Sequence, residues 1–143
     1  MTQPPIRLLV CDIDGTLVRH DKSLPTENVA AIKDLIMRGV AVSLISARPA
    51  AGILPIARQL ALKGPFGAFN GGTIFTAEGL EEQAGEVPAA LAAQLLALYA
   101  KAGVTRWLFA TGHWLTSDLA DPHTPREVMS SGLQPELDRR AHV

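Results

Sequence analysis

The chain has 143 residues, a length typical of one domain or less. Hydrophobic residues make up 48 % of it and charged residues 19 %, a balance that excludes disordered and fibrous proteins. The formal net charge of −1 excludes a global field that attracts nucleic acid or anionic membranes, so we expect neither as a partner.

Two features of the first residues bear on the compartment. One cysteine, Cys11, excludes internal disulfides and favours a reducing environment. The apolar run Leu8–Cys11 is too short for the core of a signal peptide or for a membrane span. We therefore expect a cytoplasmic protein with no membrane partner.

The chain opens with strand and helix patterns in alternation. The nearly continuous apolar run Ile6–Ile13 predicts a strand buried on both faces, which is typical of parallel α/β sheets. A helix follows from Pro25 or Thr26, and Gly39 ends it. Its apolar face at helical spacing comprises Val29, Ile32, Leu35 and Ile36.

A second strand–helix pair follows, and then a third strand. Val40–Ile45 predicts another buried strand. The helix after it runs to about Leu62, and Pro55 indicates that it either starts near that residue or kinks there. Phe66–Phe69 predicts a short third strand, and the next two predicted strands form a hairpin, Thr73–Thr76 and Leu80–Gln83.

The best candidate for a domain boundary is Gly85–Pro88. Beyond it we predict a helix, Pro88–Ala102, with Leu91, Leu95, Leu98 and Ala102 on one face. A hairpin and a short helix follow, at Thr105–Thr111, Trp114–Ser117 and Pro125–Ser131. The tail 134–143 is charged and has no clear period.

The order of these elements predicts an α/β fold with a parallel sheet and helices on its faces. In such sheets ligands bind beyond the carboxyl ends of the strands. Three clusters that could carry chemistry follow strand ends: Cys11–Thr16, Ser46–Arg48 and Asn70–Gly72. We therefore expect these clusters to form one site.

Two aspartates, Asp12 and Asp14, follow the first predicted strand with one residue between them. Two such close carboxylates repel each other, and a hard cation such as Mg²⁺ removes that cost. One carboxylate could then attack phosphorus while the other handles a proton. Gly15 permits a sharp turn that presents backbone amides to a phosphate. The alternative is an ordinary turn with Asp14-Gly15 at its corner.

Three segments resemble the haloacid dehalogenase (HAD) superfamily. Val10–Leu17, V-C-D-I-D-G-T-L, is similar to its first motif. Ser46–Pro49, S-A-R-P, resembles the second motif of its Cof-type branch, in which Thr-Gly-Arg is commoner, and Phe69–Gly72 resembles that branch's Asn-Gly element. The resemblance covers about residues 6–83. It implies that residues 1–84 form part of a three-layer Rossmannoid core and that residues 85–143 begin an α+β cap.

The resemblance also implies roles for individual residues. Asp12 would be the nucleophile, and Asp14 would protonate the leaving group and then activate water. The Asp12 carboxylate and the Asp14 backbone carbonyl would hold Mg²⁺. Ser46 would bond a phosphate oxygen and Asn70 would lie at the mouth, whereas a structural ion pair is at least as good a role for Arg48. The residues expected to contact phosphate or substrate are Ile13, Gly15, Thr16, Ser46, Ala47, Asn70 and Gly71.

Two later elements of the family site have no match in this sequence. The family uses a lysine and a Gly-Asp acidic loop on later strands, whereas this chain has no Gly-Asp pair, and Lys101 is its only lysine after residue 83. We expect the chain to stop inside the cap. The first strand would then be an exposed edge, which predicts either a longer parent protein or a homo-oligomer that covers it.

The leading functional hypothesis is a Mg²⁺-dependent phosphatase of a small phosphorylated metabolite such as a sugar phosphate. Alternatives are a phosphomutase of the same superfamily and a non-catalytic, truncated fragment. A signalling receiver domain is disfavoured because Asn70 stands where such a domain needs an aspartate. We expect Cys11 to be a small buried residue of the first strand rather than a nucleophile. We expect Trp107 and Trp114 to pack within the cap rather than to contact substrate.

Overall fold

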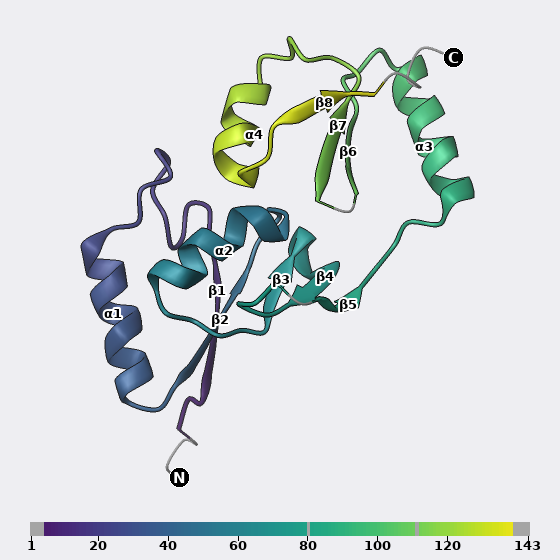
Figure 1. The fold of residues 1–143 in the computed structure, drawn as a ribbon. Coiled ribbons are helices and arrows are strands. Elements are labelled where there is room, and N and C mark those ends of the chain that lie inside the picture. Colours follow the sequence, from purple (N-terminus) through teal and green to yellow (C-terminus); the bar gives the residue numbers. More distant parts are fainter. Residues whose placement is uncertain (1–4, 80, 111, 139–143) are drawn as a thin grey trace. The chain divides into compact units, whose positions relative to one another are not determined.

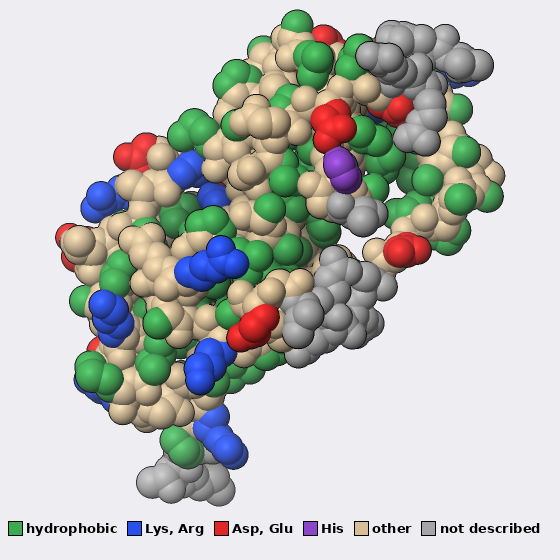
Figure 2. Space-filling view, viewed as in Figure 1, with side chains coloured by type: hydrophobic (Ala, Val, Ile, Leu, Met, Phe, Trp, Pro, Cys, Tyr) green, Lys and Arg blue, Asp and Glu red, His purple; other side chains and the backbone are tan. Residues whose placement is uncertain are grey.

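The computed structural model describes residues 5–79, 81–110 and 112–138, and at residues 81–84 it describes the backbone alone. The chain divides into two compact units, Met1–Ala84 and Gly85–Val143 (Figure 1). Among the described helices, none combines the length and the apolar character needed to cross a membrane. On the face drawn in Figure 2, Lys and Arg side chains are scattered among acidic, hydrophobic and other residues.

The first unit is built on a sheet whose described strands follow the order β1-β2-β3-β4-β5. Strands β1 to β3 are parallel, and β4 and β5 continue the sheet as an antiparallel hairpin. The strands are β1 Leu8–Asp12, β2 Ala41–Ile45, β3 Phe66–Ala68, β4 Thr73–Phe75 and β5 Glu81–Ala84. The predicted α/β class and parallel strands are confirmed, and Leu80 of the predicted hairpin lies outside the described residues.

Helix α1, Thr26–Met37, connects β1 to β2 (Figure 1). It begins directly after Pro25, whose fixed φ suits the residue before a helix, and it ends just before Gly39 at φ 79°. Ile32 lies in the core, whereas Ile36 is 41 % exposed. The predicted apolar face is therefore wrong at Ile36, because the neighbouring sheet covers a narrower stripe of the helix.

Helix α2, Ala50–Gln59, connects β2 to β3. It begins after Pro49 and contains Pro55 in its interior, so the helix does not start near Pro55 as one alternative predicted. Its end at Gln59 also comes before the predicted Leu62. Ile53 and Ala57 are fully buried and fix α2 against the sheet, which compensates for the backbone donor that Pro55 lacks.

Strand β1 is packed on one face only. Along β1 the exposure alternates: Leu9 and Cys11 join the core with α1 and α2, whereas Leu8 is 55 % exposed and Val10 is 52 % exposed. The prediction that this strand is buried on both faces is therefore wrong. Among the described strands β1 also has a single neighbour, β2, so it forms one edge of the sheet.

The second unit contains a smaller sheet with the strand order β6-β7-β8, in which β6 and β7 are antiparallel and β7 and β8 are parallel. Its elements are α3 Ala89–Lys101, β6 Trp107–Ala110, β7 His113–Thr116, α4 Thr124–Ser131 and β8 Pro135–Leu137. The predicted hairpin is present, although Thr111 lies outside the described residues. Strand β8 was not predicted, because Pro135 and its charged neighbours hide a strand that is only three residues long.

Aromatic packing forms the core of the second unit. Trp114 is fully buried, with the Trp107 ring edge-on at 5.0 Å and the Phe109 ring stacked at 5.7 Å. The prediction that these tryptophans serve packing agrees with this arrangement. The predicted face of α3 is wrong, because Leu91 is 46 % exposed and Leu98 is 59 % exposed.

Candidate active site

The parallel register brings the ends of the first three strands together. Asp12, the last residue of β1, pairs with Ile45, and Ile45 pairs with Gly67 of β3. Directly after Ile45 the chain leaves the sheet at Ser46, whose N–H donates to the Gly67 carbonyl at 3.0 Å. The three clusters expected to form one site therefore follow neighbouring strand ends.

The loop after β1 folds around one carbonyl. The Ile13 carbonyl accepts the N–H groups of Leu17 and Val18, each at 2.9 Å, and so closes a tight turn. Gly15 lies inside this turn at φ 81°, a left-handed conformation that a side chain disfavours. The Ile13 side chain is fully buried, so only its backbone can reach a ligand.

The Asp12 carboxylate is fixed by its own loop. The Thr16 hydroxyl donates a hydrogen bond of 3.1 Å to Asp12 Oδ2. Asp12 lies at an exposed position, in contrast to the buried Ile13 beside it. The arrangement therefore presents an oriented carboxylate at the end of the sheet.

Asp14 is held by two cations. Arg48 donates to both carboxylate oxygens, from Nε to Oδ2 at 2.7 Å and from Nη2 to Oδ1 at 2.8 Å. The Lys22 ammonium donates to the same Oδ1 at 2.6 Å. The Arg48 side chain is only 7 % exposed, and its Nη1 also donates to the Gly52 carbonyl at 3.1 Å. Arg48 is thus fixed by α2 and orients Asp14 in turn.

These contacts set the charge of Asp14. The hydrogen bonds from Arg48 and then from Lys22 lower the pKa of Asp14 to about 2, against the opposing effect of partial burial. Asp14 is therefore ionised at neutral pH in this arrangement. Burial, and then the charge of Asp12, raise the pKa of the Cys11 thiol, which disfavours the nucleophilic thiolate.

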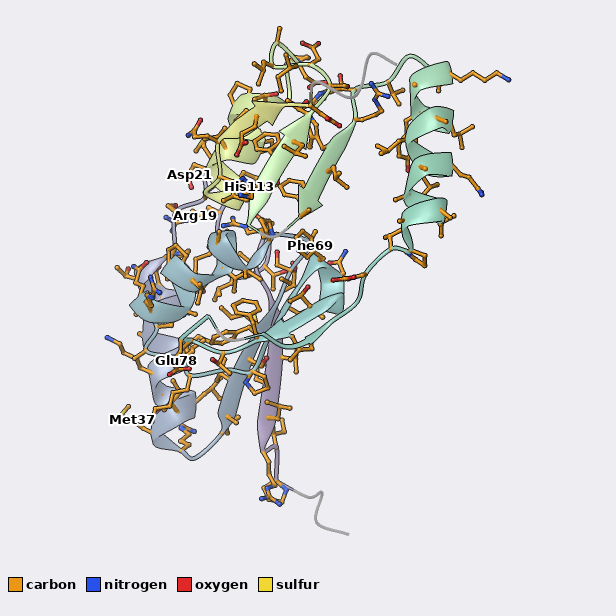
Figure 3. All side chains as sticks on the ribbon, turned by 45° about the vertical axis from the view of Figure 1, so that its right-hand side comes forward. Arg19, Asp21, Met37, Phe69, Glu78 and His113 are labelled. Atoms are coloured by element: carbon orange, nitrogen blue, oxygen red, sulfur yellow. The ribbon has the colours of Figure 1, made fainter. Side chains whose placement is uncertain are left out.

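The loops after β2 and β3 are joined by their backbones. The Asn70 N–H donates to the Ser46 carbonyl at 2.8 Å, and the Phe69 N–H donates to the Arg48 carbonyl at 3.0 Å. Phe69, labelled in Figure 3, and Asn70 both adopt a left-handed conformation, at φ 50° and 56°. These bonds hold the turn in place although neither residue is a glycine.

The remaining predicted residues lie on these two loops. Ser46 is 2 % exposed, and its Oγ accepts the Arg48 N–H at 3.2 Å, which leaves the hydroxyl proton free to donate. Ala47 is exposed between them. Asn70 and Gly71 are exposed on the short helical turn η1, Phe69–Gly71. The predicted residues thus lie at the end of β1, for Asp12, and on the three loops that follow β1, β2 and β3, for the others.

Lys22 is the site residue that the sequence did not predict. It lies eight residues after Asp14, in the loop before α1. Nothing in the sequence of that loop indicates that it folds back toward Asp14. For Arg48, the structural ion pair that the sequence left open is present.

The residues at the end of β1 offer oxygen atoms that could hold a metal ion. The Asp12 carboxylate and the Asp14 backbone carbonyl supply hard oxygen atoms of the kind that Mg²⁺ prefers, and this ion also keeps waters and phosphate oxygens. The Asp14 carboxylate is already occupied by Arg48 and Lys22, so the backbone is the better donor at that residue. No group of three or more His, Cys, Asp and Glu side chains suited to a metal occurs within the described ranges.

A family model described as haloacid dehalogenase-like hydrolase matches residues 9–139. The chain is 30 % identical over 131 residues to an HMP-PP phosphatase of Serratia proteamaculans, which covers 92 % of this chain and 48 % of that protein. It is 32 % identical over 74 residues to a phosphoglycolate phosphatase of Thermoplasma acidophilum, covering 52 % of this chain and 33 % of that protein. The chain thus spans about half the length, or less, of these curated relatives.

Solved structures agree with the fold. A haloacid dehalogenase-like hydrolase from Bacteroides thetaiotaomicron aligns with a TM-score of 0.81 at 22 % identity, covering 94 % of this chain and 52 % of that one. Another from B. subtilis aligns with a TM-score of 0.77 at 19 % identity, covering 93 % of this chain and 54 % of that one. With the family match over residues 9–139, these findings lead to one conclusion: the chain belongs to the haloacid dehalogenase-like hydrolase family.

Proposed function

We propose that this chain carries the nucleophile loop of a Mg²⁺-dependent phosphohydrolase that acts on a small phosphorylated metabolite, such as a sugar phosphate. The observation that carries the proposal is the pair of Asp12, oriented by the Thr16 hydroxyl, and Asp14, oriented by Arg48, at the end of one strand. Two relatives that are named phosphatases support the same reaction class.

In the proposed reaction, an Asp12 carboxylate oxygen attacks phosphorus and the bond to the leaving oxygen breaks with its electron pair. A proton from Asp14 goes to that leaving oxygen, and an aspartyl-phosphate remains. Water then attacks phosphorus and gives a proton to Asp14, and the bond to Asp12 breaks. Inorganic phosphate leaves, and both aspartates return to their initial state.

The two halves of this reaction make opposite demands on Asp14. The ionised carboxylate held by Arg48 and Lys22 is suited to accept a proton from water. Donating a proton to the leaving oxygen requires the protonated form, which the two cations oppose. The negative charge of an arriving phosphate would raise the pKa of Asp14 and so favour that form while both contacts remain.

The other residues of the three loops would bind the phosphate. The backbone amides of the Ile13–Thr16 turn and the Ser46 hydroxyl would donate to its oxygens, with Ala47 beside them, and Asn70 and Gly71 would lie nearer the rest of the substrate. The Asp12 carboxylate and the Asp14 backbone carbonyl would hold Mg²⁺, which supplies positive charge to offset the charge of the phosphate and the nucleophile.

We extend the proposal to the architecture. The first unit would be part of the catalytic core, and the second would be the first part of an α+β cap domain. The uncovered edge and face of β1 favour a partner for that strand, either the remainder of a longer protein or a second copy of the chain. A cytoplasmic location fits the single free thiol, Cys11.

A second candidate is a non-catalytic chain that binds phosphate or a partner protein. The observation that favours it is the Asp14 carboxylate, which Arg48 and Lys22 hold in the ionised form, whereas the proposed reaction begins with a proton on that residue.

Hydrolysis of p-nitrophenyl phosphate by this chain, with and without Mg²⁺, tests the proposal. We expect Mg²⁺-dependent turnover that Asp12→Asn abolishes and that Asp34→Asn, a surface carboxylate change on α1, leaves intact. Circular dichroism checks that each variant is folded. A folded chain without turnover, or with turnover that Asp12→Asn does not change, would contradict the proposed function and favour the second candidate.

A further inference from the structure

Lys22 lies on a short turn that is held from both sides. The Arg19 N–H donates to the Ser23 carbonyl at 2.9 Å, and the Lys22 N–H donates back to the Arg19 carbonyl at 3.0 Å. Asp21 Oδ1 accepts both the Ser23 N–H, at 3.0 Å, and the Ser23 hydroxyl, at 2.6 Å. Figure 3 labels Arg19 and Asp21 on this turn.

The turn aims Lys22 at the site at some conformational cost. Lys22 adopts φ 67°, a backbone conformation that residues other than glycine, asparagine and aspartate rarely take. Its side chain is only 14 % exposed, although lysine normally extends into water. A lysine that is both strained and withdrawn from solvent needs a compensating contact, and the contact present is Asp14 Oδ1 at 2.6 Å.

The two cations on Asp14 differ in how firmly they are fixed. Arg48 makes two bonds to the carboxylate and a third to the Gly52 carbonyl, all from a nearly buried side chain. Lys22 makes one bond, from a four-carbon chain that rotates readily. Arg48 therefore holds both oxygens of the carboxylate, and Lys22 gives Oδ1 a second donor.

We propose that Lys22 is a positioning residue for Asp14, which keeps the carboxylate turned toward the leaving oxygen. The inference rests on the proposed function, because it assigns Lys22 to the proton transfer made by Asp14. Arg48 alone leaves the carboxylate free to pivot about the guanidinium edge, and the Lys22 contact removes that freedom. Misplacement of a reacting group by about 1 Å costs on the order of a hundredfold in rate.

The leaving group provides the test. An alkyl phosphate such as glycerol phosphate has a poor leaving group that needs a proton, whereas p-nitrophenolate leaves without one. The kcat/KM value reports the first irreversible step, which is attack by Asp12 with loss of the leaving group. Loss of Lys22 should therefore lower kcat/KM for the alkyl phosphate much more than for p-nitrophenyl phosphate.

The variant of choice is Lys22→Asn, because asparagine tolerates the left-handed backbone while it removes the ammonium. We expect its kcat/KM for the alkyl phosphate to fall by about tenfold to a hundredfold, with p-nitrophenyl phosphate little changed. Lys22→Arg keeps the positive charge and should retain most of the natural kcat/KM for the alkyl phosphate. Lys33→Asn, an exposed lysine of α1, is the matched control and should change neither substrate. Asp21→Ala keeps Lys22 but loosens its turn, and should show a weaker loss of the same kind.

Equal losses on both substrates in folded Lys22→Asn, or no loss on either, would overturn the role of Lys22 and leave the proposed function standing. A wild-type chain without Asp12-dependent turnover would instead contradict the proposed function, and the role of Lys22 with it. If Lys22→Asn does not fold, Lys22→Arg and Asp21→Ala still decide, because the inference requires a substrate-dependent loss in Asp21→Ala.

Discussion

The guanidinium of Arg48 binds both carboxylate oxygens of Asp14, a residue 34 positions earlier in the chain. This pair joins the loop after β1 to the loop after β2. It also connects both loops to α2, through the bond from Arg48 to the Gly52 carbonyl. The ion pair is thus structural as well as electrostatic.

Replacement of Arg48 by methionine should destabilise the first unit. It leaves the Asp14 carboxylate and the Gly52 carbonyl short of donors, which we expect to cost about 2 kcal/mol. Amide hydrogen exchange of the β1 and β2 segments measures the change. Arg38→Met is the matched control, because the exposed Arg38–Asp34 pair should contribute about 0.5 kcal/mol at most. Equal losses of protection in the two variants would contradict the prediction.

Magnesium should raise the stability of the first unit through Asp12. An ion that binds only the folded chain at ten times its dissociation constant stabilises it by about 1.4 kcal/mol. We expect slower exchange of the residues around β1 in Mg²⁺ and no such effect in Asp12→Asn. A Mg²⁺ effect of equal size in that variant would place the ion elsewhere.

Two glycines of the site should respond differently to alanine. At Gly15, φ 81° disfavours a side chain but the space around it is open, so we expect a cost of about 1 kcal/mol. At Gly67 the new Cβ would lie 3.1 Å from Ile45 Cγ1, so the Ile45 side chain would have to move by a few tenths of an ångström, and we expect a cost of about 1–3 kcal/mol. Exchange of the Ser46 amide, which bonds the Gly67 carbonyl, should quicken in Gly67→Ala and stay slow in Gly15→Ala.

The second unit should lose stability in acid through Asp121. Hydrogen bonds from the Thr105 side chain and then from the His123 N–H lower the pKa of Asp121. A carboxyl whose folded pKa is lowered favours folding above its unfolded pKa, about 3.9, and this contribution is lost as the pH falls through the folded pKa. Tryptophan fluorescence follows this unit alone, because both tryptophans, Trp107 and Trp114, lie in it.

The comparison that tests this pH dependence is between two variants. The denaturation midpoint of Asp121→Asn should fall less steeply below about pH 4 than that of the natural chain. Glu86→Gln, which changes an exposed carboxylate of the same unit, is the matched control. An unchanged slope in Asp121→Asn would count against the assigned hydrogen bonds.

Local patterns were sufficient to predict the elements of the first unit and the loops that carry the site. The run Leu8–Asp12 followed by Gly15 identifies a strand that ends in a sharp turn. A pattern of this kind spans only a few neighbouring residues, so it can be recognised from the sequence. The contacts of Asp14 with Lys22 and Arg48 could not be predicted in this way. They depend on the register of β1 against β2 and on the path of the loop before α1. No periodic pattern in the sequence indicates either of these.

Burial was harder to predict than element type. An apolar strand looks the same whether one face or both are covered, so Val10 gave no sign that it would be half exposed. The same holds for α3, where alanine and leucine occur on every side and no narrow stripe distinguishes the packed face. Strand β8 depends on its pairing with β7 rather than on its own residues.

Backbone bonds join the loops after β2 and β3: Ser46 with Gly67 and Asn70, and Arg48 with Phe69. Within the first loop the Ser46 Oγ also accepts the Arg48 N–H, so the chain path depends partly on that side chain. The exposed methyl group of Ala47 takes no part in these bonds. A substitution at this position would change the chemistry offered to a ligand without moving the scaffold that presents it. Position 47 is therefore where related sequences could acquire new substrates at the lowest cost in stability.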